Sequence, residues 1–462
     1  MAQARSMTRE SNKVTINRVG PVAAEPAVPA SILPLSTGAR RYALGLLFLI
    51  AVMNAVDRQI VNILAEDIRH ELGLRDWQIG MMTGLAFSIL YSTIGLPIAR
   101  LAERSDRPRI IAVAVVVWSG FTAVCGLAQS FVQFALARVG VGVGEAGCAP
   151  PGHSLISDYV PKAKRASALA FFSMGGPVGG LVGMATGGIV ADLWGWRAAF
   201  LVVAVPGVIL GLITALTLPE PRRASQFHGL ADARPKLADA FRELGACRTY
   251  LLFGLGSVVM SIVVSGHAAF LGSFFLRNHA AGLSELGAPL NLQATGFLGL
   301  AVGLITGVGG VLGALIGGQI ADRAAVKSPR AYSTLSAWAA FLSLPTYIVA
   351  MLVPSTPWAL GLLFLPYLTW NLALGSIYAV PQGVVRPQLR ATGIAVVFFF
   401  GNLLGTGLGP LLVGISSDRM QAGGMTDGEA IRVAQIVATL IGLVAVWAYW
   451  RAGKYIEADM AG

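Results

Sequence analysis

The sequence predicts an all-α membrane protein in which twelve transmembrane helices form two bundles of six. Of its 462 residues, 55% are hydrophobic and only 12% are charged, about half the charged share of a soluble globular protein. The hydrophobic residues fall in blocks of about 20, the length that crosses about 30 Å of hydrocarbon as a helix. One polar linker divides these blocks into two groups of six.

Each hydrophobic block is expected to be a helix, because a segment in lipid must satisfy its own backbone N–H and C=O groups. The predicted helices span residues 41–65, 77–102, 110–128, 131–158, 166–190, 197–217, 249–276, 294–321, 331–353, 357–385, 391–417 and 430–452. The 56 glycines fit this interpretation, since small residues let membrane helices approach one another closely.

Around these helices, the sequence predicts five regions. They are a disordered tail (1–39), an N-terminal bundle (40–218), a linker (219–248), a C-terminal bundle (249–455) and a short tail (456–462). Within the linker, residues 231–248 are predicted to form a short amphipathic surface helix. Because one chain already holds a complete pair of bundles, we expect a monomer.

The net charge of +11 is explained by its placement. Lys and Arg concentrate in the two tails, in the linker and in the loops that follow helices 2, 4, 8 and 10. Such cationic excess marks the cytoplasmic side, so both termini are expected in the cytoplasm and the chain in the inner membrane, with membrane lipids around it. No nucleic-acid partner is needed. Cys125, Cys148 and Cys247 are too few and too scattered for a metal site or a disulfide framework.

Similar stretches recur at the ends of helices. Gly318–Arg323 closes helix 8 much as Ala99–Arg104 closes helix 2, six helices earlier, and Gly187–Asp192 and Gly414–Arg419 close helices 5 and 11. Equivalent helices that end alike indicate a duplicated six-helix unit. The recurrence three helices further on, at the opposite face, indicates inverted repeats within each half.

The stretches after helices 2 and 8 resemble the loop motif of the major facilitator family, G-x-L-A-D-R-x-G-R, and the resemblance covers residues 40–455. The first copy departs from it, with Ala99 for Gly, Glu103 for Asp and Asp106 for the second Gly. The resemblance implies that charges of this motif bridge the bundles when the cytoplasmic side is closed; the alternative is ordinary solvated loop charge. The residues assigned to this gate are Glu103, Arg104, Asp322 and Arg323.

Helix 5 contains Gly175–Gly180, with Pro177 inside it, and helix 11 contains Gly405–Pro410. The first run resembles the glycine–proline motif common in major facilitator antiporters. Glycine allows close packing and proline bends a helix, so we interpret these runs as packing features rather than as substrate contacts.

Three ionisable residues fall inside predicted helices of the first bundle: Asp57, Arg138 and Glu145. An ionisable group at membrane depth is costly and by default marks a pathway. At 1.5 Å per residue, Asp57 lies about 24 Å from the cytoplasmic start of helix 1 and Arg138 about 10 Å from the outer start of helix 4. The two distances are measured from opposite faces of a hydrocarbon core about 30 Å thick. Asp57 and Arg138 therefore lie at nearly the same depth, and an ion pair between them is expected. Glu145 shares the helix face of Arg138, since it follows by nearly two turns.

This layout predicts a proton switch. Burial disfavours an ionised carboxyl and a nearby arginine favours it, so separating Asp57 from Arg138 would favour proton uptake, with Glu145 as a second site or relay. A permanent ion pair that only holds two helices together is the alternative. No cofactor is expected beyond the proton gradient.

The second bundle carries neutral polar and aromatic residues in its helix cores, which suits an amphiphile better than a sugar. His267 is interpreted there as a hydrogen-bonded packing residue. The residues predicted to contact substrate are Asn54, Arg58, Tyr367, Thr369, Trp370, Asn371 and Asn402.

Two stretches are similar to the Spinster family of major facilitators: Asn54–Arg58 with Asp67–Ile68, and Arg138–Gly147 with Ser154–Asp158. The family includes lysolipid and sphingolipid transporters. The resemblance therefore implies proton coupling at Asp57, Arg138 and Glu145 and a lipid-like or drug-like substrate, and the composition suggests a bacterial member.

The leading hypothesis is a proton-coupled antiporter that exports an amphiphilic small molecule by alternating access. A second transport hypothesis is a uniporter in which Asp57 and Arg138 serve only as a gate. An intramembrane enzyme would need a nucleophile with a base or a metal cluster at membrane depth, and no such motif is present. A sensor usually adds a soluble domain, and none is predicted.

Overall fold

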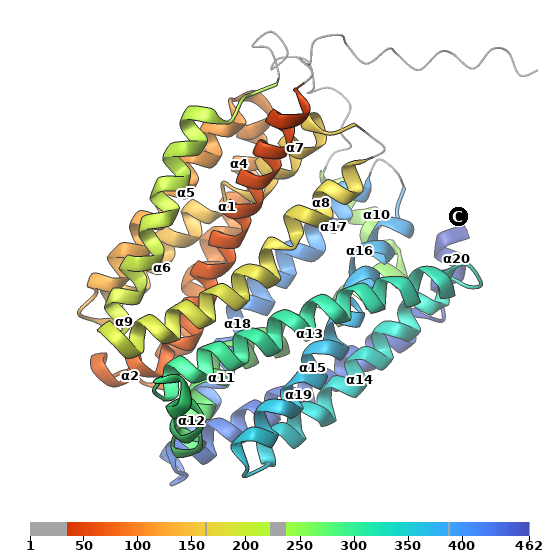
Figure 1. The fold of residues 1–462 in the computed structure, drawn as a ribbon. Coiled ribbons are helices and arrows are strands. Elements are labelled where there is room, and N and C mark those ends of the chain that lie inside the picture. The colour runs from red at the N-terminus through yellow and green to blue at the C-terminus, as the bar shows by residue number, and fades with distance from the viewer. Residues whose placement is uncertain (1–34, 162–163, 222–236, 387–388, 462) are drawn as a thin grey trace, which may run out of the picture.

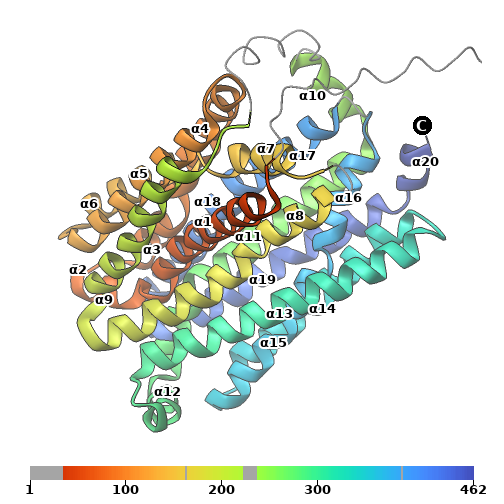
Figure 2. The same cartoon turned by 45° about the horizontal axis from the view of Figure 1, so that its top comes forward.

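In the computed structural model, residues 35–161, 164–221, 237–386 and 389–461 are described. Helices account for most of these residues, and no strand occurs among them. Figures 1 and 2 show the helices before the linker packed beside those after it, with α9 and α13 side by side between the two halves.

In the described part of the first half there are ten helical elements, in which the six predicted segments are found. They are α1 (Thr37–Ile63), α2 (Ala65–Leu72), α3 (Asp76–Gly80), the π-helical turn η1 (Met81–Leu85), α4 (Ala86–Arg104), α5 (Arg107–Leu127), α6 (Phe131–Glu145), α7 (Ala149–Tyr159), α8 (Arg165–Ser173) and α9 (Gly175–Thr217).

The linker and the second half add the remaining elements. They are α10 (Leu237–Ala246), α11 (Arg248–Asn278), α12 (Ala280–Gly287), the 3-10 turn η4 (Ala288–Leu290), α13 (Ala294–Ala325), α14 (Arg330–Leu352), α15 (Thr356–Leu372), α16 (Leu374–Gly383), α17 (Arg390–Phe400), the π-helical turn η6 (Gly401–Thr406), α18 (Gly407–Ala422), α19 (Asp427–Ala452) and α20 (Ile456–Ala461).

Ten helices in the described ranges are long and apolar enough to cross a membrane. Two features of the structure account for the difference between these ten helices and the twelve predicted segments. The stretch Ser167–Thr217 holds two predicted segments, because Gly195 leaves helical geometry there with a φ of 82°. The predicted segment 131–158 is divided into α6 and α7, which are each too short to count alone. The twelve-helix prediction is confirmed.

Two predicted tails were drawn too long. Helix α1 begins at Thr37, inside the predicted tail 1–39, of which residues 1–34 lie outside the described ranges. Residues 456–462 were predicted as a tail, but Ile456–Ala461 form α20. This helix docks because the Asp459 carboxylate accepts a hydrogen bond from the Thr249 backbone N–H at the start of α11, at 3.0 Å. The predicted surface helix is present as α10.

The elements α10 and α20 lie at one end of the molecule, and α2 and α12 lie at the other (Figure 1). We call these the linker end and the far end. The far end holds the connections around residues 64–75, 128–130, 279–293 and 423–426.

Glycines allow α1 and α9 to pack backbone against backbone. A side chain on Gly179 would overlap the carbonyl oxygen of Val52, and one on Gly183 would lie 2.8 Å from the backbone of Val56. Small residues at such crossings are the general device of membrane helix packing. This crossing fixes α1 at the turn that precedes Asp57.

We predict that Gly179→Val lowers stability by about 1–3 kcal/mol or more, because the side chain must push α1 away from α9. Thermal unfolding in detergent, followed by tryptophan fluorescence, measures the loss. Gly176→Val is the matched control, since a side chain at Gly176 would meet nothing within 4 Å. Equal melting temperatures for the two variants would contradict the close crossing.

Candidate functional site

The candidate site lies where α6 ends and the chain bends before α7. Glu145 is the last residue of α6, residues 146–148 form a turn, and Pro150 and Pro151 open α7. Prolines lack the N–H that would continue the helix. The glycines before the bend bring α6 close to its neighbours, because a side chain on Gly142 would lie 2.5 Å from the Phe87 carbonyl oxygen.

The first ion pair of the site joins α1 to α6. Arg138 Nη1 lies 3.2 Å from Asp57 Oδ2, as the estimated depths predicted, and both residues are at most 2% exposed. The hydroxyl of Thr122 on α5 donates to the other oxygen of Asp57. Three helices therefore meet at one carboxylate.

A second ion pair lies beside the first and was missed by sequence analysis. Arg58 Nε donates to Glu145 Oε2 at 2.7 Å, and the guanidinium lies over the rings of Phe87 and Tyr91, at 4.7 and 4.6 Å from their centroids. The Glu145 side chain is fully buried, while that of Arg58 is 30% exposed. Arg58 had been assigned to substrate alone. The order of charges in the sequence already indicates this pair. Helix 1 carries an acid followed by a base, helix 4 carries a base followed by an acid, and each acid can pair with the base on the other helix.

The four charges sum to zero, but their hydrogen bonding is incomplete. Glu145 Oε1 and Arg138 Nε are buried without a partner among the described residues. A buried polar atom without a partner is costly. We call Asp57, Arg58, Arg138 and Glu145 the ionic cluster. Its incomplete hydrogen bonding is not what a purely structural cluster that only holds helices together would need.

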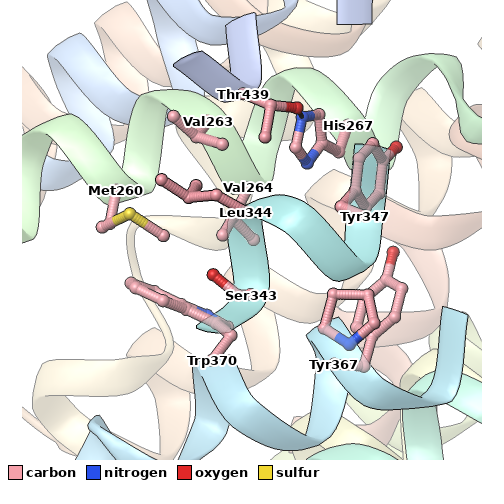
Figure 3. Close-up of a pocket in the computed structure, with 11 residues that line it drawn as sticks. Met260, Val263, Val264, His267, Ser343, Leu344, Tyr347, Tyr367, Trp370 and Thr439 are labelled. Atoms are coloured by element: carbon pink, nitrogen blue, oxygen red, sulfur yellow. Dashed lines mark hydrogen bonds between the residues drawn. The ribbon is translucent and has the colours of Figure 1, made fainter. Parts of the chain in front are cut away.

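The predicted substrate residues of the second half lie on two helices. Tyr367 and Trp370 on α15 line a cavity of about 30 Å³ whose other walls include Met260, Val263 and Leu344. Figure 3 shows both aromatic rings facing α11 and α14 across this space. Most of the lining is apolar, and the polar side chains in it are His267, Ser343 and Thr439 with the hydroxyls of the two tyrosines.

His267 borders this cavity and is a packing residue, as predicted. Its Nε2 lies 2.9 Å from Thr439 Oγ1, and its ring stacks on Tyr347 with 3.7 Å between centroids. Figure 3 shows these three side chains together at one end of the cavity.

The other predicted substrate residues of this half bond to their own helices. Thr369 Oγ1 donates to Leu365 O at 2.9 Å, Asn371 Nδ2 to Tyr367 O at 2.8 Å, and Asn402 Nδ2 to Phe398 O at 3.0 Å. Within the described ranges no hydrogen bond connects them to the predicted substrate residues of α1.

Asn54 is half-buried on α1, one turn before Arg58 and so on the same helix face. Among the predicted substrate residues that are not themselves in the ionic cluster, Asn54 is the one on α1.

The predicted gate residues lie at the linker end. Glu103 and Arg104 are in the last turn of α4, and their side chains lie outside what the structure describes. Asp322 and Arg323 are exposed in the last turn of α13, and they have no hydrogen bond or ion pair with another described residue. Their predicted gating role stays a prediction.

A second ionic feature, at the far end, joins the two halves and was not predicted. Arg277 on α11 bonds both oxygens of Glu66 at 2.9 Å and both oxygens of Asp76 at 2.8 and 2.6 Å. Asp76 is fully buried and also accepts from Ser417 of α18 at 2.6 Å. We call this cluster the far-end latch.

Two further carboxylates cap helices across the same boundary. Asp418 of the second half accepts from the backbone N–H groups of Asp76 and Trp77, both at 3.0 Å. Asp192 of the first half accepts from those of Gln293 and Gly296, at 2.8 and 3.0 Å. Carboxylates at helix starts satisfy free N–H groups. The far end is thus closed by charge and by capping.

We predict that Arg277→Gln opens the far end, because removing one partner of a buried pair costs about 3–5 kcal/mol. Spin labels at the exposed positions Gln129 and Met425, one in each half at this end, would report longer distances, measured in a background without native cysteines. Arg451→Gln, an exposed cation of α19, is the control. Unchanged distances in Arg277→Gln would contradict a latch.

The family model of the Major Facilitator Superfamily matches residues 47–410. An MFS-type efflux pump of Mycolicibacterium smegmatis is 30% identical over 413 residues, which is 88% of this chain and 91% of the relative. Human protein spinster homolog 1 is 26% identical over 460 residues, covering 94% of this chain and 85% of the relative.

The zebrafish sphingosine-1-phosphate transporter SPNS2 is 26% identical over 396 residues, covering 82% of this chain and 76% of the relative. Among solved structures, a bacterial homologue of the human lysosomal transporter Spinster, in an inward-facing and unoccupied conformation, superimposes with a TM-score of 0.80. It is 29% identical and covers 92% of this chain and 99% of that structure.

These relatives are transporters, not enzymes, and they are multi-pass membrane proteins. The matches span both halves of the chain. The relatives named Spinster are similar to this chain over most of its length, and the chain belongs to the Major Facilitator Superfamily.

Proposed function

We propose that this transporter is a proton-coupled antiporter that exports an amphiphilic small molecule, such as a lysolipid, a sphingolipid or a drug, by alternating access. The ionic cluster carries the proposal. It places two carboxyls and two guanidiniums at membrane depth, on the helices that face each other inside the first half. The names of the relatives support the substrate class, since one is a sphingosine-1-phosphate transporter and another an efflux pump.

The ionic cluster is suited to proton coupling because both of its ion pairs join α1 to α6. Both pairs would break if these two helices moved apart. Moving these helices apart would leave Asp57 and Glu145 charged in a low-dielectric interior, and a proton removes that cost. Glu145 keeps one oxygen without a partner, whereas both oxygens of Asp57 accept hydrogen bonds, so Glu145 has the free position at which a proton could bind. Arg58, with a third of its side chain exposed, links this acceptor to the space where a substrate headgroup would lie.

Antiport requires that the proton and the substrate compete. A substrate whose polar head carries a positive charge or hydrogen-bond donors would compete with the proton for the carboxyls of the cluster. Its apolar part would lie against the aromatic wall of Tyr367 and Trp370. Between the ionic cluster and the aromatic wall, polar contacts to the substrate would come from Asn54, Thr369, Asn371 and Asn402. These contacts would form when the helices of the two halves move apart.

Charge placement supports an orientation with the linker end and both termini in the cytoplasm of a bacterial cell, in the inner membrane. In that orientation the far end faces outward and is closed by the latch. In the opposite state, Glu103, Arg104, Asp322 and Arg323 would bridge the halves at the linker end. We further propose that a monomer is the working unit.

We predict that Asp57→Asn and Glu145→Gln each reduce transport driven by a pH gradient at least about tenfold, because the substituted amide cannot take up a proton. Proteoliposomes with a trapped pH dye, supplied with a fluorescent lysolipid or a cationic dye, would report substrate and proton fluxes together. Glu285→Gln, an exposed acid on α12, is the control. Unaltered proton dependence in both variants would remove the coupling proposal.

We also predict that substrate affinity rises with pH in the wild-type protein and loses this dependence in Glu145→Gln, because the deprotonated cluster is the form that binds substrate in an antiporter. Equilibrium binding of the same fluorescent substrates in detergent, from pH 5 to 8, measures it. Affinity that falls with pH would indicate symport. Substrate flux with no proton flux in the wild type would support a uniporter with Asp57 and Arg138 as a gate.

A further inference from the structure

Asp67 occupies an unusual position at the far end. It lies on α2 between two neighbouring pockets of about 520 and 470 Å³, and His70 and Thr295 line both of them as well. The side chain is half-buried. No hydrogen bond or ion pair joins it to another residue within the described ranges, although the acid next to it, Glu66, is held by Arg277.

The neighbours of Asp67 are fixed in place by the closed state. Glu66 is bound to Arg277 across the boundary between the halves, and Asp192 of α9 caps the start of α13. Glycine at position 296 lets Asp192 come so close, because a side chain there would overlap its carboxylate. Closing the far end therefore assembles two bound carboxylates around a third that has no partner.

Other charged groups at these pockets compensate Asp67 only in part. His70 lines both pockets and lies 3.1 Å from Glu66. Arg277 is occupied by Glu66 and Asp76. The remaining charged residues are engaged elsewhere: Glu71 with Arg197, and Asp427 with Arg69. The start of α13 offers Gln293 and Thr295, which carry no charge.

We propose that Asp67 makes closure of the far end sensitive to protons: a proton on its carboxyl stabilises the closed far end, and loss of that proton favours opening. The inference goes beyond the proposed function, because it holds for an antiporter or a uniporter and does not involve the ionic cluster.

Electrostatics agrees with this assignment. Burial, followed by the negative charges of Asp192 and Glu66, raises the pKa of Asp67 to about 6, and the charge of His70 acts in the opposite direction. When the far end opens, the carboxyl gains water and moves away from Asp192, so its pKa is expected to return to about 4.

The sign of the pH effect follows from this difference. A carboxyl with a raised pKa in the closed state stabilises that state fully below the pKa of the open state. The stabilisation is lost as pH rises through the pKa of the closed state. The far end should therefore be most firmly closed at about pH 4 and should open progressively as pH rises through about 6. A two-unit difference corresponds to a shift on the order of 100-fold in the closed-to-open ratio, and partial solvent exposure lowers it toward about tenfold.

Spin labels at Gln129 and Met425 test the proposal in full-length protein in lipid nanodiscs, without substrate. From pH 4 to 7.5, the wild-type protein should lose closed-state population by about tenfold or more. Asp67→Asn, which cannot ionise, should keep the closed distribution throughout this range. Glu285→Gln, an exposed acid at the same end, is the control and should behave as the wild type. A full wild-type pH response in Asp67→Asn would overturn the proposal.

Two more variants separate Asp67 from other titrating groups. His70→Gln removes a positive neighbour and should move the midpoint to higher pH; if it abolished the response instead, His70 would be the sensor and the proposal would be wrong. Glu145→Gln should leave the response intact, so this experiment can succeed or fail independently of proton coupling at the ionic cluster. If Asp67→Asn does not give a monodisperse protein, Asp67→Ser serves with the same expected outcome.

Discussion

The structure depends on one constraint: charges that lie at membrane depth must be neutralised within the protein. Asp57, Arg58, Arg138 and Glu145 satisfy it by alternating in sign on two helices, so that each acid meets a base. The pairs are buried among the rings of Phe87 and Tyr91 and the hydroxyl of Thr122. Since removing any one member leaves an uncompensated charge, the position of α1 relative to α6 and the charge state of the cluster cannot change independently.

The far end also neutralises buried charges, but at helix ends and with different partners. There the charges sit at helix ends, where backbone N–H groups assist them, and the bonds cross between the halves instead of staying within one. The two clusters therefore do different things. The ionic cluster links charge to the arrangement of helices within the first half. The far-end latch links charge to the contact between the two halves. The proposed alternating access would use both kinds of coupling, because the substrate site would have to respond to its contents and the two ends would have to open in turn.

The sequence was sufficient for the fold because lipid leaves few choices for a hydrophobic segment. Hydrophobic blocks of sufficient length can only be helices, and the twelve predicted segments lie within a few residues of the observed ones. Local breaks were harder. The turn after Glu145 and the π-helical turn at Gly401–Thr406 depend on how glycines pack against neighbours, which hydropathy does not encode.

The candidate site was predicted in part for a similar reason. Depth along two helices was enough to pair Asp57 with Arg138, since both positions can be counted from helix ends. The role of Arg58 was missed because the order of charges on the two helices, although visible in the sequence, does not show which way the Arg58 side chain turns. The far-end latch was missed because Arg277 and Asp76 lie 201 residues apart at helix ends, where charge looks like ordinary surface. Only the fold brings them together.

The turn at residues 146–148 has a mechanical consequence. The prolines that follow it have no N–H to donate, so the backbone ladder is already interrupted there. The linker-end half of this membrane segment, α7, joins α6 through short turn bonds, from Gly147 N–H to Gly144 O and from Cys148 N–H to Glu145 O, both at 3.1 Å. Bending at the joint would strain these turn bonds rather than a regular helical ladder, while α6 stays anchored by its glycines against α4 and α5. Glu145 occupies the last rigid position before the joint. A change in the charge of the Glu145 carboxyl thus occurs directly beside the joint about which α7, a helix of 11 residues, would change its angle.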